Sequence, residues 1–190
     1  MDTRDLDEAL GLVPGLVSIL RQESDRGCIL VASAMVETEL EAHILRRLWP
    51  CDRKSDELLS RSMSAPISSF SSKINLAYRI GLIPESERNI CHQLRELRNA
   101  SAHDITRQEF TENHFKDRTT NIIKESTMFW ESLRAATAKQ IADGKQPGTV
   151  RELVELMTWR YAFEFFFALH VAYKKVQLPR VPQLTAVYAA

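Results

Sequence analysis

Apolar residues recur along most of this chain at steps of three and four, the spacing that places side chains on one face of an α-helix. No segment alternates apolar and polar residues as a half-buried strand would. We therefore expect an all-α protein, a single-domain bundle of long antiparallel helices that spans residues 1–190. The predicted helices cover residues 6–22, with an interruption at Pro14 and Gly15, residues 27–48, residues 69–81 and residues 84–103.

Residues that cap helices support these boundaries. Ser24 or Asp25 precedes the helix over residues 27–48, and its side chain can accept a hydrogen bond from the first turn. Ser68 or Ser69 caps the next helix in the same way, and Gly81 supplies a common helix end. The serine-rich stretch between these helices, residues 56–69, is predicted to be a long loop.

The C-terminal half carries weaker boundary signals. We expect helical pieces over residues 110–115 and 122–141. Thr149 and Glu152 match a capping box, which predicts a helix of roughly 25 residues that runs to Lys175. The chain beyond it contains two prolines and is expected to be extended.

This last helix contains a phenylalanine-rich segment over residues 161–173, interrupted by Glu164 and His170. The segment is shorter than the roughly 20 residues that a membrane crossing needs, so we expect a core helix. Arg160 lies four residues before Glu164 and can pair with it. The helix has more apolar circumference than one packing face requires, which favours a homo-oligomer.

Composition excludes several classes of protein. The 190 residues are 44% hydrophobic, which is enough for one sizeable core, and 25 basic residues balance 25 acidic ones. Without a net positive charge, nucleic-acid binding is possible only through a local patch, and an anionic membrane is not an expected partner. The three cysteines lack metal-ligand spacing, so we expect reduced thiols, no metal and no cofactor. The acidic N-terminus does not resemble a signal peptide, which predicts a cytoplasmic protein.

Charged residues occupy two positions where apolar residues are expected. Glu37 shares a face with Leu30, Ala34 and Ile44 on the helix over residues 27–48, and Arg98 shares the apolar face of the helix over residues 84–103. A carboxylate or a guanidinium near apolar packing needs an opposite charge. The sequence therefore predicts a contact between Glu37 and Arg98.

Other polar residues lie close to these two. His92, Glu96, Asn99 and His103 form a stripe beside Arg98, which we expect to be able to hydrogen-bond along its length. Arg98 and His103 are five residues apart, about 140° around a regular helix, so they meet at one substrate only if the helix ends or distorts near Ser101. Lys73 follows two serines at a helix start, where an anion can bind or where the side chain is simply solvated.

Three segments within residues 25–103 resemble the mannitol operon repressor (MtlR) family: residues 25–28, the run from Ser69 to Pro84, and residues 95–103. The resemblance implies an all-helical bacterial protein involved in repression of a sugar-alcohol operon without an obvious DNA-reading module. We find no basic recognition helix, which agrees with that implication. Residues 104–190 match no family pattern and form a C-terminal helical extension.

A shorter resemblance concerns Arg98, Asn99 and His103, which are similar to the R-x4-6-H motif of HEPN domains. That family includes metal-independent ribonucleases. The resemblance implies that Arg98 stabilises the charged phosphorane, His103 transfers protons and Asn99 orients the phosphate.

The residues themselves leave the role of this segment open. Glu37, Lys73, Arg98, Asn99 and His103 are predicted to form either a structural network or a binding site. Our principal hypothesis is a cytoplasmic, MtlR-like transcriptional regulator that acts through protein–protein contacts and is not an enzyme. The alternative is a ribonuclease that uses Arg98, Asn99 and His103. A purely structural subunit is the third possibility.

Overall fold

The computed structural model describes residues 3–51, 56–59, 65–103, 110, 112–126, 129, 154 and 158–185. Within these residues the chain forms α-helices and one 3-10 helix and contains no strand, so the predicted all-α class is confirmed. The elements are α1 (Thr3–Arg21), α2 (Asp25–Arg47), α3 (Phe70–Arg79), α4 (Glu85–His103), α5 (Asn113–Glu125), α8 (Trp159–Gln177) and η1 (Leu178–Arg180).

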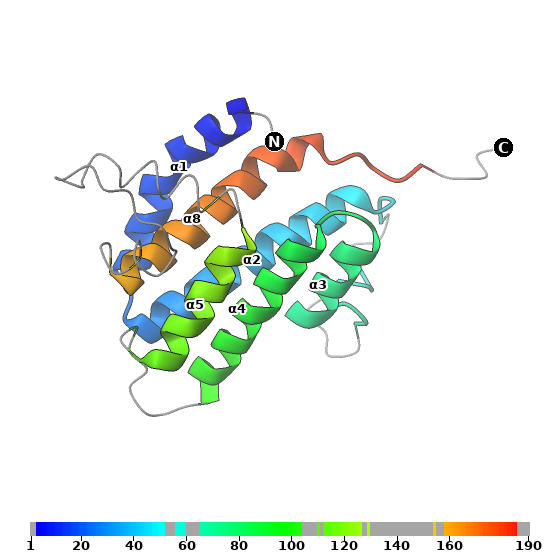
Figure 1. Cartoon of the computed structure of the whole chain (residues 1–190). Helices are drawn as coiled ribbons and strands as arrows, with labels where there is room; N and C mark the ends of the chain where they lie inside the picture. The colour runs from blue at the N-terminus through cyan, green and yellow to red at the C-terminus, as the bar shows by residue number, and fades with distance from the viewer. Residues whose placement is uncertain are drawn as a thin grey trace.

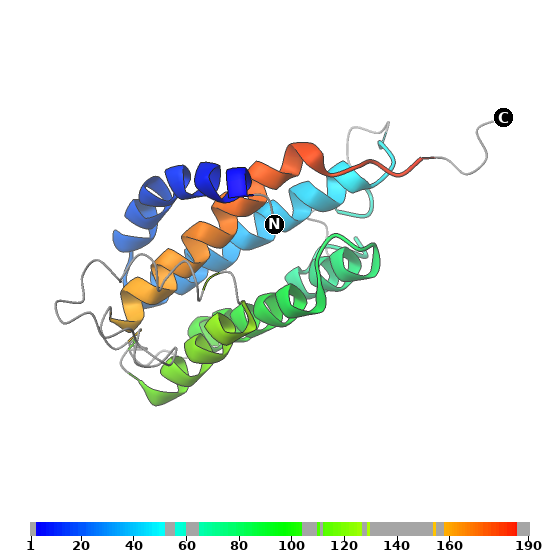
Figure 2. The ribbon, with the colours of Figure 1, turned by 45° about the horizontal axis from the view of Figure 1, so that its top comes forward.

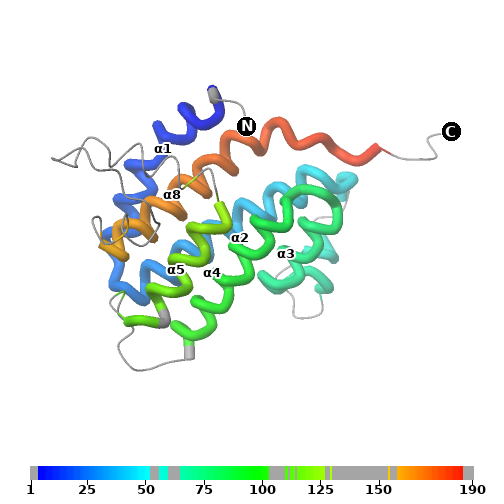
Figure 3. Tube along the Cα trace, viewed as in Figure 1, coloured from blue at the N-terminus to red at the C-terminus, as the bar shows by residue number. Residues whose placement is uncertain are grey.

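The helices form two layers (Figures 1 and 2). One layer consists of α1, α8 and α2, and the other consists of α3, α4 and α5. The layers meet where α2 contacts α3 and α4 and where α8 contacts α5. Successive long helices run in opposite directions, as the tube in Figure 3 shows for α1 and α2 and for α4 and α5. Helix α2 therefore lies at the centre of the molecule, with neighbours in both layers.

Helix α8 is the most continuously buried helix of the described residues, because every residue from 162 to 172 is buried. Phe163 and Phe166 are fully buried and contact rings from outside α8, namely Phe110, Phe115 and Phe129. A helix that is apolar on all sides is expected to be enclosed. Here α1, α2 and α5 enclose it within one chain, so its apolar circumference does not require a second copy. The homo-oligomer itself stays a prediction.

Local sequence determines the ends of α2, α3 and α4 as expected. Ser24 caps α2 by accepting a hydrogen bond from the amide of Gly27 at 3.1 Å. Ser69 and Ser72 form a reciprocal capping box at the start of α3. Gly81, with a φ of +71°, ends the turn after α3 in the left-handed region, which favours glycine. Helix α4 reaches His103, as predicted.

Three other predicted boundaries are wrong. Helix α1 continues through Pro14 and curves instead of breaking (Figure 2). A single helix, α5, covers residues 113–125 and so spans the gap between the two predicted pieces, while most of the piece predicted over residues 122–141 lies outside the described residues. Helix α8 begins only at Trp159, because Thr158 adopts a φ of +75° that interrupts any helix arriving from Thr149. The expected capping box of Thr149 and Glu152 lies outside the described residues.

After α8 the chain makes the short η1 turn before it extends, so the predicted extended tail begins later than expected. A search of the described helices for a stretch that could cross a bilayer finds none with the required length and apolar character.

Candidate functional site

The predicted contact between Glu37 and Arg98 is present. Nη1 of Arg98 in α4 lies 2.7 Å from Oε2 of Glu37 in α2, and the ion pair joins the two layers of the fold. The second oxygen of Glu37 accepts a hydrogen bond from Nζ of Lys73 at 2.9 Å. Lys73 also pairs with Glu41, one turn further along α2, at 2.7 Å. We call these four residues the Glu37 network.

Lys73 is the most deeply placed member of the network, with only 7% of its side chain exposed. The capping box at the start of α3 orients the first turn of this helix so that Lys73 points toward α2. Burial by itself lowers the pKa of Lys73, but the carboxylates of Glu41 and Glu37 outweigh burial and raise this pKa above its ordinary value of 10.5. The ammonium group therefore stays charged, and its charge is balanced inside the network.

A surface pocket of about 520 Å³ opens above the network between α2 and α3. We call it the α2–α3 pocket. Small side chains of α2, Ala34, Thr38 and Ala42, keep its floor low, and the polar groups of the network line one side. Its lining consists of Ala34, Glu37, Thr38, Glu41, Ala42, Leu45, Leu59, Ser68 and Lys73.

Exposed apolar side chains belong to the lining of this pocket or lie close to a lining residue in sequence. Leu45 lines the pocket and remains 45% exposed, and Leu58 directly precedes the lining residue Leu59. Trp49 follows at the end of α2 and is the most exposed large apolar residue in the described part, at 61%. A pocket that combines an apolar rim with balanced charges is typical of a protein-binding surface.

Of the other predicted residues, Asn99 does not join the network among the described residues. The side chain of Asn99 is exposed, and no hydrogen bond from it is present among the described residues. The backbone of His103 is the last residue of α4, but its side chain lies outside the described residues. Helix α4 continues through Ser101 to His103, and residues 104–109 lie outside the described residues, so the joint action of Arg98 and His103 near a helix end stays a prediction.

The predicted stripe of His92, Glu96, Asn99 and His103 does not form a continuous hydrogen-bonded row in the described residues. Glu96 instead pairs with Arg118 of α5 at 2.6 Å. The predicted row fails because of a contact between helices. Helix α5 packs against α4 and places the guanidinium of Arg118 beside Glu96, which the sequence of α4 alone does not indicate.

A second group of charged residues, buried between α4 and α8, was missed by the sequence analysis. Nζ of Lys174 lies 2.7 Å from Oε1 of Glu87, and Nε2 of His170 lies 3.6 Å from the same oxygen. We call these three residues the α8 polar cluster. They line a cavity of about 230 Å³ together with Phe129 and other residues. One feature of the sequence could have indicated this cluster: His170 and Lys174 lie four residues apart in an apolar helix and so share one face of it.

Burial lowers the pKa of His170 to about 4, with Glu87 opposing this effect and Lys174 and His43 adding to it. His43 is buried as well, and its Nδ1 donates to the carbonyl of Glu39 at 2.8 Å. His170 is therefore neutral at physiological pH, and Lys174 and Glu87 carry the charges of the cluster. The arrangement holds α4 against α8.

Acid is expected to destabilise the protein through His170. As the pH falls from the ordinary pKa of 6.5 toward 4, the unfolded chain takes up the proton before the folded protein does. Stability is therefore full above this window and falls within it, by about 1.4 kcal/mol for each pH unit. Urea unfolding at a series of pH values should show this slope. In His170→Gln, the slope of the free energy of unfolding against pH should lose the contribution of one proton, about 1.4 kcal/mol for each pH unit. An unchanged slope would contradict this role of His170.

The predicted pair of Arg160 and Glu164 has a structural role. Arg160 pairs with Glu164 as expected and also with Asp25 at 2.7 Å.

Burial raises the pKa of Cys28 to about 12 and raises the pKa of Cys91 as well, so neither thiol is a ready nucleophile. Among the described residues no group of three or more potential ligands is arranged to hold a metal ion.

Comparison of the chain with protein-family models, with curated proteins and with solved structures gives no significant match.

Proposed function

We propose that this chain is a regulatory protein that acts through protein–protein contacts, and that the α2–α3 pocket is the surface that binds its partner. The observation that carries the proposal is the pairing of both cations at the site. Arg98 and Lys73 each have a carboxylate of α2 within 2.9 Å. A site built to handle phosphate leaves a cation free for the substrate, whereas this site neutralises its cations and offers an apolar rim.

The transcriptional part of the proposal rests on the resemblance to the MtlR family. A regulator of this kind need not read DNA, and the net charge of zero gives the chain no overall attraction to it. In this proposal the chain binds another protein and thereby changes that protein's activity or availability.

The test is photo-crosslinking from the pocket. Benzoylphenylalanine at Thr38, expressed in cells of the source organism, should give a discrete adduct whose partner mass spectrometry identifies. The same group at Asn121, which is exposed on α5, serves as the control.

The affinity of pocket variants for the purified partner is then measured. The substitution Thr38→Trp fills the pocket and should weaken binding by about tenfold or more, while Asn121→Trp leaves it unchanged. Equal binding by both variants, with the fold intact by circular dichroism, would reject the pocket as the docking surface.

A metal-independent ribonuclease is the second candidate, and one observation favours it. The side chain of Arg98 is 39% exposed, and Arg26 donates a hydrogen bond to the carbonyl of Ala102 at the same end of α4, so a second guanidinium lies near the motif. In this role Arg98 stabilises the phosphorane and His103 moves the proton, as the HEPN resemblance implies.

This alternative predicts cleavage of RNA in the presence of EDTA that is lost in His103→Ala. If the wild-type protein leaves a mixed set of RNAs intact and the variant behaves identically, the enzyme hypothesis is rejected.

A further inference from the structure

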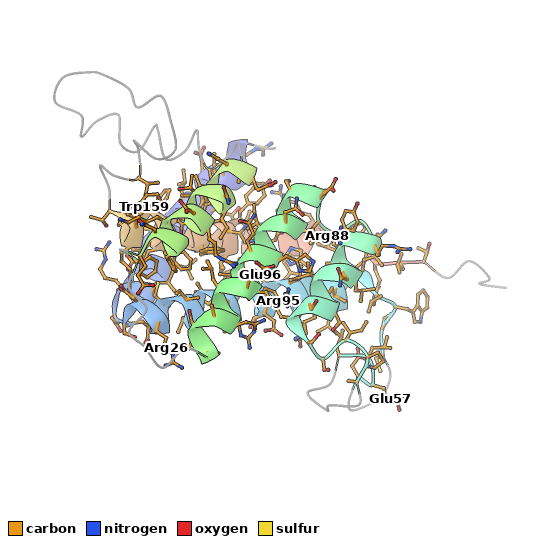
Figure 4. The ribbon with its side chains drawn as sticks, turned by 60° about the horizontal axis from the view of Figure 1, so that its bottom comes forward. Arg26, Glu57, Arg88, Arg95, Glu96 and Trp159 are labelled. Atoms are coloured by element: carbon orange, nitrogen blue, oxygen red, sulfur yellow. The ribbon has the colours of Figure 1, made fainter. Side chains whose placement is uncertain are left out.

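A second charged surface lies on α4, away from the α2–α3 pocket. Arg88, His92 and Arg95 follow one another at steps of four and three and therefore share one face of the helix. All three are partly exposed. Figure 4 shows Arg88 and Arg95 on α4, with Glu96 beside them. We call these three residues the α4 arginine stripe.

Neither arginine of the stripe has an ion-pair partner in the described part of the chain. By contrast, the next arginine of α4, Arg98, is paired with Glu37, and Arg118 of α5 is paired with Glu96. The guanidinium of Arg88 instead stacks on the ring of Tyr78, 4.8 Å from its centroid. Such stacking fixes the plane of the guanidinium and leaves its edge available to an oxyanion.

Both guanidiniums are also partly removed from water. The Nε atoms of Arg88 and Arg95 are buried and have no hydrogen-bond acceptor. Burial, followed by the charges of Arg95 and Arg88, lowers the pKa of His92, with Glu96 opposing this effect, so the imidazole between the two arginines is neutral. Desolvated cations without an anion are costly, and a bound oxyanion reduces this cost.

The spacing of the stripe indicates which anion fits. Seven residues of α-helix place the attachment points of Arg88 and Arg95 about 10.5 Å apart. A facing helix with carboxylates seven residues apart repeats the same distance and meets both guanidiniums. Nucleic acid is a less favourable occupant, because 25 acidic residues balance the 25 basic ones and the chain has no overall positive field that attracts a long polyanion to two arginines.

We propose that the α4 arginine stripe binds an acidic helical segment of a partner protein, with carboxylates seven residues apart that pair with Arg88 and Arg95. The inference deepens the proposed function and rests on it, because it names the chemistry of the protein that is bound. It concerns a surface separate from the α2–α3 pocket, so each surface is tested alone.

The probe is a fluorescein-labelled helical peptide of about 20 residues, long enough to stay helical in water, with two glutamates seven residues apart. Fluorescence anisotropy at low salt should show binding to the full chain. The double variant Arg88→Gln/Arg95→Gln should bind about tenfold more weakly, because both pairs are lost. The control Arg46→Gln/Lys124→Gln removes the same charge from exposed positions on α2 and α5 and should bind like the wild type.

Three results would overturn the inference: equal binding by the stripe variant and the wild type, equal binding of a peptide whose glutamates lie on opposite faces, or stripe-dependent binding of a single-stranded RNA that is tighter than binding of the peptide. If the double variant does not fold, Arg95→Gln alone replaces it, with about threefold weaker binding as the expected result. Crosslinking from Thr38 does not depend on this surface, so its failure is distinguishable from failure here.

Discussion

Replacing Arg160 by methionine is expected to destabilise the protein by about 3–5 kcal/mol, because it leaves a buried charge without its main partner. Glu164 is 2% exposed, and Nε of Arg160 donates to its carboxylate. The remaining cation, Arg21, lies 3.5 Å from Glu164 and is itself largely exposed. Urea unfolding followed by circular dichroism measures the loss.

Backbone contacts add to the expected cost. Nη2 of Arg160 donates to the carbonyls of Leu20 and Glu23, both at 2.8 Å, at the turn where α1 ends and α2 begins. Carbonyls at a helix end lack partners inside the helix, so the guanidinium supplies hydrogen bonds that the substitution removes.

The double variant Arg160→Met/Glu164→Leu separates the two contributions. It removes the orphaned carboxylate and should recover a large part of the lost stability, while the loss of the carbonyl contacts persists. A loss below about 1 kcal/mol in the single variant would show that water or Arg21 compensates Glu164 fully.

Replacing Glu87 by leucine is the second substitution with a large expected effect, at about 3 kcal/mol. Only 7% of the Lys174 side chain is exposed, and its ammonium lies 2.7 Å from Glu87. No other carboxylate in the described part of the chain forms an ion pair with Lys174, so the substitution leaves a buried cation beside the neutral His170.

The compensating variant is Glu87→Leu/Lys174→Met, which removes both charges and should regain most of the stability. Lys124, which is exposed on α5, provides the control, since Lys124→Met removes a lysine without leaving a buried carboxylate. Equal losses from Glu87→Leu and Lys124→Met would contradict a special role for the buried pair.

Features that depend on neighbours in sequence were predictable. Ser24, Ser69 and Gly81 act on the backbone within a few residues, so the ends of α2 and α3 follow from local hydrogen bonding and glycine conformation. The contact between Glu37 and Arg98 was predictable for a related reason, because each residue interrupts an apolar face and each needs the opposite charge.

Features that depend on distant parts of the chain were not predictable. The α8 polar cluster joins Glu87 of α4 to His170 and Lys174 of α8, and no spacing along the sequence connects them. The positive φ of Thr158, which begins α8, is unusual for a β-branched residue and has no sequence signature. The role of Asn99 and His103, the homo-oligomer and the resemblance to the MtlR and HEPN families stay predictions.

The central claim is that Arg98 stabilises the folded state through its ion pair with Glu37 and is not free to bind a substrate. A double-mutant cycle of Glu37→Gln and Arg98→Gln, read as free energies of unfolding, tests it most directly. The pair is partly buried, 2.7 Å apart, and should show a coupling of about 1 kcal/mol. A coupling below about 0.3 kcal/mol would mean that the two side chains act independently and that Arg98 is free for other chemistry.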